Sequence, residues 1–185
     1  MPLSIDLPAN GFVVLTRDGL LALRGALFRD MGANAAAVLQ EAGYAGGGSL
    51  FEAFARWLQT HGGPAPEALP AAQFGVRAAE FFRDLGWGTF ALATLDGAAA
   101  IDSTDWIEAD PSEPLDFPGC YFTAGTLADF FGRLAGQPLA VMEVECRSMG
   151  AARCRFLVGT AETMQHVYDE MGRGLGYEEA LHAPA

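Results

Sequence analysis

The spacing of apolar residues changes near residue 88, and this change constrains the fold more than any other feature of the chain. Before it, apolar residues recur at the three- and four-residue intervals of a helix, as Leu20, Leu23 and Leu27 do. After it, stretches such as 88–95 (GTFALATL) alternate in the manner of a strand. Helices first and strands afterwards indicate an α+β fold, with N-terminal helices packed on an antiparallel sheet.

The order of the expected elements follows from these spacings and from glycine, proline and helix-capping residues. Helices are expected at 17–31, 34–44, 49–60, 70–85, 121–134 and 160–171, with a break at the glycine run 46–48. Strands are expected at 11–16, 88–95, 98–106, 139–147 and 153–159, and Asp96-Gly97 predicts a hairpin turn. We expect a single domain over residues 1–174 and a flexible C-terminal tail over 175–185.

The charge of the chain excludes several classes of partner. The 185 residues carry a net charge of −12, all eleven basic residues are arginine, and there is no lysine. Such a chain is repelled by nucleic-acid phosphates and by anionic lipid, so we expect neither nucleic acid nor a membrane as a partner. The missing lysine also excludes a P-loop and a Schiff base.

The N-terminal sequence and the cysteine count indicate the cellular compartment. The first residues lack the positive and apolar segments of a signal peptide, and no apolar run approaches the ~18 residues that span a membrane. An odd number of cysteines, three, favours a reducing compartment over a disulfide framework. We therefore expect a cytoplasmic protein.

The three cysteines lie between residues 120 and 154, each at the edge of an expected helix or strand. Cys146 and Cys154 flank one turn, so they can meet across a hairpin. Together with Cys120 and one carboxylate they would make a closed tetrahedral zinc site, with no open position for a substrate. Glu143 and Glu145 are the candidate carboxylates. Residues three apart on a flat strand point to opposite faces, so pairing Glu143 with Cys146 requires a bulge or a strong twist.

Spacing alone leaves two interpretations of these cysteines. Free cysteine is among the most buried residue types, so three core cysteines are an ordinary alternative to a metal site. A site of three thiolates and a carboxylate would be anionic, and Arg147, Arg153 and Arg155 are near enough in sequence to offset its charge.

A resemblance to a known family favours the metal. Residues 117–159 (FPGCYFTAGTLADFFGRLAGQPLAVMEVECRSMGAARCRFLVG) resemble the 4-vinyl reductase domain family: a Cys leads into a helix of small residues, followed by Gly-x-Pro, Glu-Val-Glu-Cys-Arg, a glycine turn and Cys-Arg-Phe. That family is similar to the sensory domains of bacterial aromatic-responsive regulators and, distantly, to TRAPP-type trafficking subunits. The resemblance implies a structural zinc held by Cys120, Glu143, Cys146 and Cys154, and therefore favours Glu143 over Glu145.

The same resemblance implies a function: a stand-alone binding or sensory module for a hydrophobic small molecule, acting as a homodimer and able to signal to a separate signalling or pathway protein. Its implied ligand positions are Trp106, Phe130, Phe122 and Phe90. Aromatic residues at such spacing are often simply core residues. Because none of the three histidines lies in the matching region, we expect a ligand that is larger or more apolar than phenol.

Two other functions stay open. The chain could be an accessory factor or enzyme in tetrapyrrole (bacteriochlorophyll) vinyl-group reduction, the activity from which the family takes its name. No Gly-x-Gly-x-x-Gly follows an expected strand, and the acidic residues at 102–110 are expected on a solvated face, so no catalytic residue is expected. The chain could instead be a scaffold that works through protein contacts, which would require an exposed apolar patch.

Overall fold

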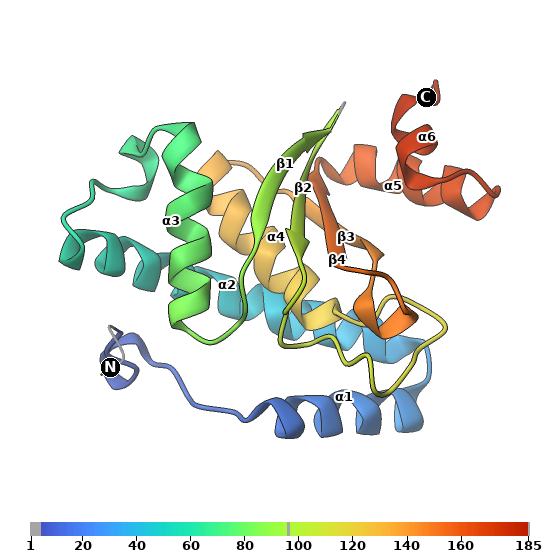
Figure 1. The fold of residues 1–185 in the computed structure, drawn as a ribbon, viewed down its shortest axis with the longest axis horizontal. Helices are drawn as coiled ribbons and strands as arrows, with labels where there is room; N and C mark the ends of the chain where they lie inside the picture. The colour runs from blue at the N-terminus through green and yellow to red at the C-terminus, as the bar shows by residue number, and fades with distance from the viewer. Residues whose placement is uncertain (1–4, 96, 185) are drawn as a thin grey trace.

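A four-stranded antiparallel sheet lies at the centre of the structure, a computed structural model that describes residues 5–95 and 97–184 (Figure 1). The strands are β1 (Ala91–Leu95), β2 (Ala98–Ser103), β3 (Ala140–Glu145) and β4 (Cys154–Gly159), in the order β1-β2-β4-β3. Every neighbouring pair is antiparallel, which confirms the expected α+β class. Asp96 of the expected hairpin turn lies outside the described residues, and Gly97 has a positive φ of 76°.

The helices are α1 (Arg17–Met31), α2 (Asn34–Thr60), α3 (Ala71–Asp84), α4 (Tyr121–Ala135), α5 (Ala161–Gly172) and α6 (Tyr177–His182). Short 3-10 turns lie at η1 (Pro8–Asn10), η2 (Pro66–Ala68) and η3 (Arg147–Met149). Threonine side chains cap two of the helices: Thr16 accepts a hydrogen bond from the backbone N–H of Gly19, and Thr160 accepts one from that of Thr163. Within the described part of the chain, no helix combines the length and apolarity needed to cross a membrane.

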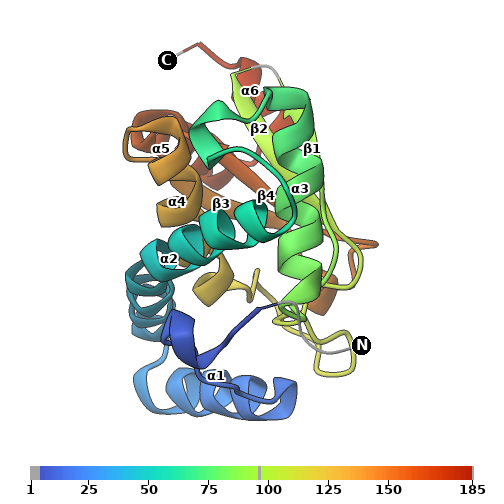
Figure 2. The ribbon, with the colours of Figure 1, turned by 90° about the vertical axis from the view of Figure 1, so that its left-hand side faces the viewer.

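The two faces of the sheet pack against different helices, because successive strand residues point to opposite sides. Ile101 and Phe156 face the main core, which they share with buried residues of α2, α3 and α4. Ala100 and Leu157 face the other way and pack with α5 and α6. Helix α1 lies apart from both groups, along the lower edge of the molecule in Figure 1 and in Figure 2.

Helix α2 runs unbroken through the glycine run where the sequence predicted a break, so the expected pair of helices at 34–44 and 49–60 is wrong. The reason is its packing against α4. A Cβ on Gly43 would overlap the carbonyl group of Phe122, and one on Gly47 would lie 2.6 Å from the Cβ of Asp129. The missing side chains let two helix backbones approach closely, and this contact offsets the low helix propensity of glycine.

Residues 12–16 do not form the expected strand. They are extended but lie outside the sheet, and Val13 and Val14 are 91% and 79% exposed. β-branched residues fit a pleated, half-buried surface, but they form a strand only when a partner strand is present. In the described residues this segment has no such partner, so the prediction of a strand at 11–16 is wrong for the single chain.

Residues 177–182, expected within a flexible tail, form helix α6 instead. Ala180 is fully buried against the outer face of the sheet and α5. The Tyr177 hydroxyl donates to Glu145 Oε1 at 2.6 Å and accepts from Arg155 Nη1 at 2.9 Å. Tertiary contacts that local sequence does not reveal therefore hold this segment in place.

Candidate metal centre and apolar groove

Three cysteines and one glutamate converge at the end of the sheet where α4 begins. Cys120 directly precedes α4, Glu143 lies on β3, Cys146 follows β3, and Cys154 opens β4. One donor atom from each residue lies within 4.8 Å of the others, and all four residues are buried. The fold thus brings together four residues that could hold a metal ion, and they are those that the resemblance named.

A β-bulge in β3 explains how Glu143 and Cys146 share one site. Glu143 lies opposite Phe156 of β4, whereas Glu145 lies opposite the adjacent Arg155, so β3 carries one extra residue here. Glu143 therefore points toward the helices and Glu145 toward the outer face, where its carboxylate is bound by other groups. The bulge that the sequence required is present, and Glu145 is not among the clustered donors.

The Glu143 carboxylate has one oxygen bound and one free. Its Oε2 accepts a hydrogen bond from the backbone N–H of Cys120 at 2.8 Å. Its Oε1 is the single buried side-chain oxygen or nitrogen in the described residues without a hydrogen-bond partner. An unpartnered buried acceptor costs roughly 1–3 kcal/mol, and a cation among the thiols would satisfy it. Three thiolates and one carboxylate are also a donor set that a closed tetrahedral zinc site uses.

Electrostatics oppose full ionisation of these four groups on their own. Burial raises the pKa of Cys120 well above its usual range. Burial, together with the negative charge of Cys146, raises the pKa of Glu143 to about 8. The pKa of Cys146 is lowered, because the thiols of Cys120 and Cys154 hydrogen-bond to it. One thiolate is thus favoured, and a bound divalent cation would release the remaining protons.

Arg153 and Arg155 do not offset the charge of this cluster, contrary to the expectation from sequence. Arg155 makes two hydrogen bonds of 2.6 Å to Asp102, and Arg153 makes two of 3.0 Å to Glu145. Both arginines share the outer face of the sheet, whereas Cys154 between them points to the inner face. Their ion pairs instead join β2, β3 and β4.

A buried carboxylate that the sequence placed on a solvated face supports the start of α4. Glu108 is 1% exposed, and it accepts hydrogen bonds from the backbone N–H groups of Phe122 (3.1 Å) and Thr123 (2.8 Å) and from the Thr123 hydroxyl (2.6 Å). Burial raises its pKa even though these bonds act in the opposite direction. Arg24 of α1 donates to its backbone carbonyl at 2.6 Å. No local spacing could reveal this cap, because Glu108 is distant from α4 in sequence.

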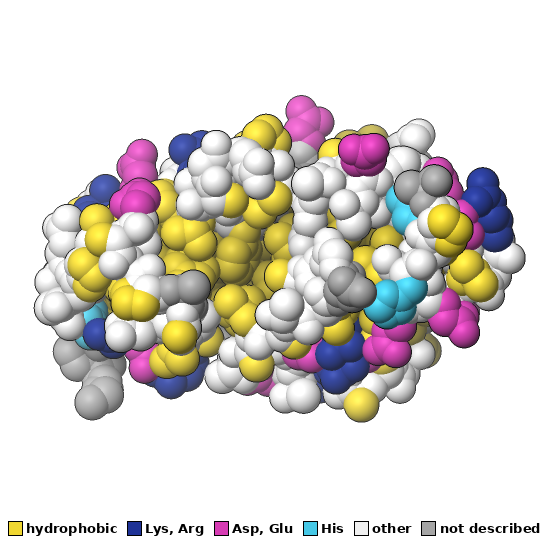
Figure 3. Space-filling view, turned by 90° about the horizontal axis from the view of Figure 1, so that it is seen from above, with side chains coloured by type: hydrophobic (Ala, Val, Ile, Leu, Met, Phe, Trp, Pro, Cys, Tyr) yellow, Lys and Arg dark blue, Asp and Glu magenta, His cyan; other side chains and the backbone are white. Residues whose placement is uncertain are grey.

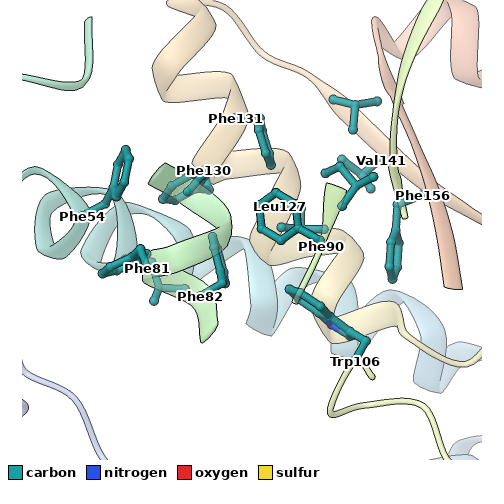
Figure 4. Packing of buried hydrophobic residues seen from close by; sticks show 14 of the residues in the cluster. Phe54, Phe81, Phe82, Phe90, Trp106, Leu127, Phe130, Phe131, Val141 and Phe156 are labelled. Atoms are coloured by element: carbon teal, nitrogen blue, oxygen red, sulfur yellow. The ribbon is translucent and has the colours of Figure 1, made fainter. Parts of the chain in front are cut away.

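The predicted ligand positions lie in and around one aromatic cluster (Figure 4). Trp106, Phe130 and Phe90 are 1%, 0% and 8% exposed. Phe82 packs against all three, with ring centroids 5.9, 5.2 and 5.7 Å away, respectively. Phe122 lies at the edge of the cluster, stacked on a tryptophan ring at 6.0 Å. In this structure these rings fill the interior by contacting one another.

An apolar groove of about 470 Å³ opens beside the aromatic cluster. It lies between η2, α3, the C-terminal end of α4 and the sheet, at the end of β2 and β4 opposite Cys154. Figure 3 shows this face of the molecule, hollowed and lined by hydrophobic side chains. The larger residues that line it include Phe74, Leu92, Ile101, Phe131, Leu134 and Val158. None of the four predicted ligand positions is among its lining residues.

The segment that builds the metal cluster also defines the class of domain. Residues 108–160 match the vinyl-4-reductase domain family, and this range contains Cys120, Glu143, Cys146 and Cys154. The chain therefore carries a domain of this family, and the resemblance stated from its sequence motifs is confirmed. A comparison with curated proteins finds no match.

Solved structures show where this fold has been seen. The phenol-responsive sensory domain of the transcription activator PoxR, crystallised with phenol, superposes with a TM-score of 0.65 and 20% identity, over 94% of this chain and 85% of that one. A vinyl-4-reductase family protein from Methanocaldococcus jannaschii aligns with a TM-score of 0.40 and 19% identity, over 54% of this chain and 71% of that one. The first likeness establishes that the chain has the fold of such a sensory domain.

Proposed function

We propose that this chain is a binding or sensory module for a hydrophobic small molecule. The observation that carries the proposal is an open apolar groove in a fold that, in PoxR, serves a phenol-responsive sensory domain. A concave, mainly apolar site is the usual form of a small-molecule pocket. No catalytic group is assigned to the chain, so binding rather than turnover is its activity in this proposal.

The second part of the proposal is a structural zinc ion bound by Cys120, Glu143, Cys146 and Cys154. Its support is the closed, buried donor set and the unpartnered Glu143 Oε1. Zinc would join the start of α4 to β3 and β4, and all four positions would be filled by protein. The three free, buried thiols also suit a reducing compartment, and we place the protein in the cytoplasm on that ground.

The third part is assembly as a homodimer, through which binding could be passed to a separate signalling or pathway protein. Its support is the extended segment before α1, where Val13, Val14 and Leu15 are 91%, 79% and 56% exposed. Apolar β-branched residues in an extended, unpaired segment favour pairing with a second chain. Helix α1 continues this surface with Leu23, which is 51% exposed.

Native mass spectrometry tests the zinc and the ligand together. We expect one zinc ion per freshly purified chain, and a further mass for a co-purified apolar molecule that organic solvent extracts. Cys154→Ser and Glu143→Gln should lose most of the zinc, while Glu145→Gln, the matched control on the outer face, should retain it. A chain without zinc, with three titratable thiols in a stable fold, would show that the cysteines are core residues.

A further inference from the structure

The interior of this domain leaves no room for a ligand among the aromatic residues that the resemblance singled out. The Phe82 ring contacts those of Trp106 and Phe130, and the Phe130 ring also packs against those of Phe54 at 5.5 Å and Phe131 at 5.4 Å. The Trp106 indole N–H is already used, since it donates to the Thr123 hydroxyl at 2.7 Å. A molecule bound there would have to displace packed rings and break a buried hydrogen bond.

The groove offers the space that the interior lacks. Its 470 Å³ lies within the ~300–1,000 Å³ of typical small-molecule sites. Phe74 and Phe131 separate it from the aromatic cluster, since each lines the groove and also packs against Phe130. Leu92 on its other side is 40% exposed, so apolar surface there faces water in the chain alone. Covering such surface drives apolar molecules into a site.

Charge narrows the class of molecule that fits. Glu67, at the rim on η2, is the one charged residue among those that line the groove, and no arginine or histidine lines it. The whole chain carries a net charge of −12. A carboxylate or phosphate bound in the groove would have no cationic partner and would be repelled by this background. A neutral end group avoids the repulsion, and a cationic one gains from it.

We propose that the groove lined by Phe74, Leu92, Ala99, Ile101, Phe131 and Val158 is the ligand site, and that it takes apolar molecules without an anionic group. This inference rests on the proposed binding function and adds the place and the chemical class. It separates the ligand from Trp106, Phe130, Phe90 and Phe122, which form the wall behind the groove. Phe131 and Phe74 connect that wall to the ligand.

The chain contains a built-in reporter for this site. It has three isoleucines, Ile5, Ile101 and Ile107, so δ1-methyl labelling gives three signals. Ile101 lines the groove, whereas Ile107 lies in the loop whose backbone carbonyl binds Arg17. The indole N–H of Trp106 reports separately on the interior. We expect decan-1-ol to shift the Ile101 signal in a saturable way, with much smaller shifts at Ile107 and at the Trp106 indole.

A pair of matched variants tests the location. Ala99→Phe places a ring in the groove from β2, and it should weaken decan-1-ol binding at least about tenfold. Ala91→Phe adds the same ring at an exposed position on β1, one residue from Leu92, and therefore on the opposite face. That control should bind decan-1-ol as the unmodified chain does.

The end group tests the charge. Decylamine should bind at least as tightly as decan-1-ol, and decanoate should bind more weakly than either. Because Glu67 is exposed, Glu67→Gln should cost decylamine only about two- to fivefold in affinity and leave decan-1-ol unchanged. Preferential binding of decanoate would overturn the assignment of ligand class.

The outcomes separate this inference from the function on which it rests. Decan-1-ol binding that survives Ala99→Phe, or that shifts the Trp106 indole and not Ile101, would place the ligand in the interior; the groove assignment would fail and the binding function would stand. If none of the three probes binds and no apolar molecule co-purifies, both fail. Loss of binding in Ala99→Phe alone, with the Ile101 shift, supports both.

Discussion

Glu143 should make the stability of the metal-free protein depend on pH. Its pKa is raised from 4.5 to about 8 in the folded chain, chiefly by burial. Between these two values the folded chain keeps a proton that the unfolded chain has lost, so the free energy of unfolding falls as pH rises from about 4.5 to about 8. We expect the urea midpoint of chelator-treated protein to decrease across this range, and Glu143→Gln to remove most of the decrease.

The control for this experiment is Glu145→Gln. Hydrogen bonds from Arg153 and Tyr177 lower the pKa of Glu145, despite some burial that acts the other way. Its contribution to stability is therefore lost only when the pH falls below the ordinary range of a carboxyl group, and the slope between 4.5 and 8 should persist in this variant. A midpoint of the unmodified chain that does not change over the same range would refute the role given to Glu143.

Glu108 should stabilise the fold by capping α4. In Glu108→Gln, the amide NH₂ would face a backbone N–H that the carboxylate now accepts, leaving a buried donor without a partner. We expect a loss of roughly 1–3 kcal/mol in the free energy of unfolding, measured with urea on the zinc-loaded protein. Glu113→Gln, at an exposed position in the same loop, should change it by less than about 0.5 kcal/mol. Equal effects of the two changes would show that Glu108 is no cap.

Among the elements, the contact of α2 with α4 gives glycines of one run opposite roles. Gly47→Ala would press a methyl group into Asp129, and we expect it to destabilise the fold by about 1–3 kcal/mol. An added Cβ at Gly46 meets nothing within 4 Å, so Gly46→Ala should stabilise the helix by about 0.5–1 kcal/mol. Thermal unfolding of the two variants checks the sign. Stabilisation by both would mean that the helices are not in close contact at Gly47.

The elements also show how far sequence reasoning reaches. Periodicity identified α1, α3, α4, α5 and the four strands of the sheet, because their apolar faces are buried against neighbours within the chain. It failed at the glycine run, where a tertiary contact overrides helix propensity, and at residues 12–16, where strand propensity has no partner strand. It assigned the tail after Gly174 no structure, because the anchors of α6 lie on β3 and β4.

The site followed the same rule. The clustered cysteines were visible in the sequence, and the need for a bulge near Glu143 followed from the geometry of a strand. The groove could not be predicted, because its walls come from η2, α3, α4 and the sheet, and only packing brings them together. The cap provided by Glu108 was hidden for the same reason, since its partners are distant in sequence.

For the molecule as a whole, the exposed segment before α1 predicts an oligomer. We expect the 19.5 kDa chain to scatter light as a dimer and the double variant Val13→Asp, Val14→Asp to scatter as a monomer. Charges in an apolar interface are costly when they have no partners, which is why this change should separate the chains. Val76→Asp, at a position on α3 that is 59% exposed, should remain dimeric. A monomer in the unmodified chain would exclude this assembly.

The bulge in β3 can be expressed as a rule of parity. Along a regular strand, side chains that point to one face are separated by even numbers of residues. Glu143 and Cys146 are an odd number apart, and the single extra residue opposite β4 is what makes them face the same way. Inserting one more residue between them would reverse that parity and turn one of the two donors away from the cluster, whereas inserting two would restore it. The tolerance of this segment to insertions should therefore alternate with their length, a property that substitutions at the donors themselves cannot reveal.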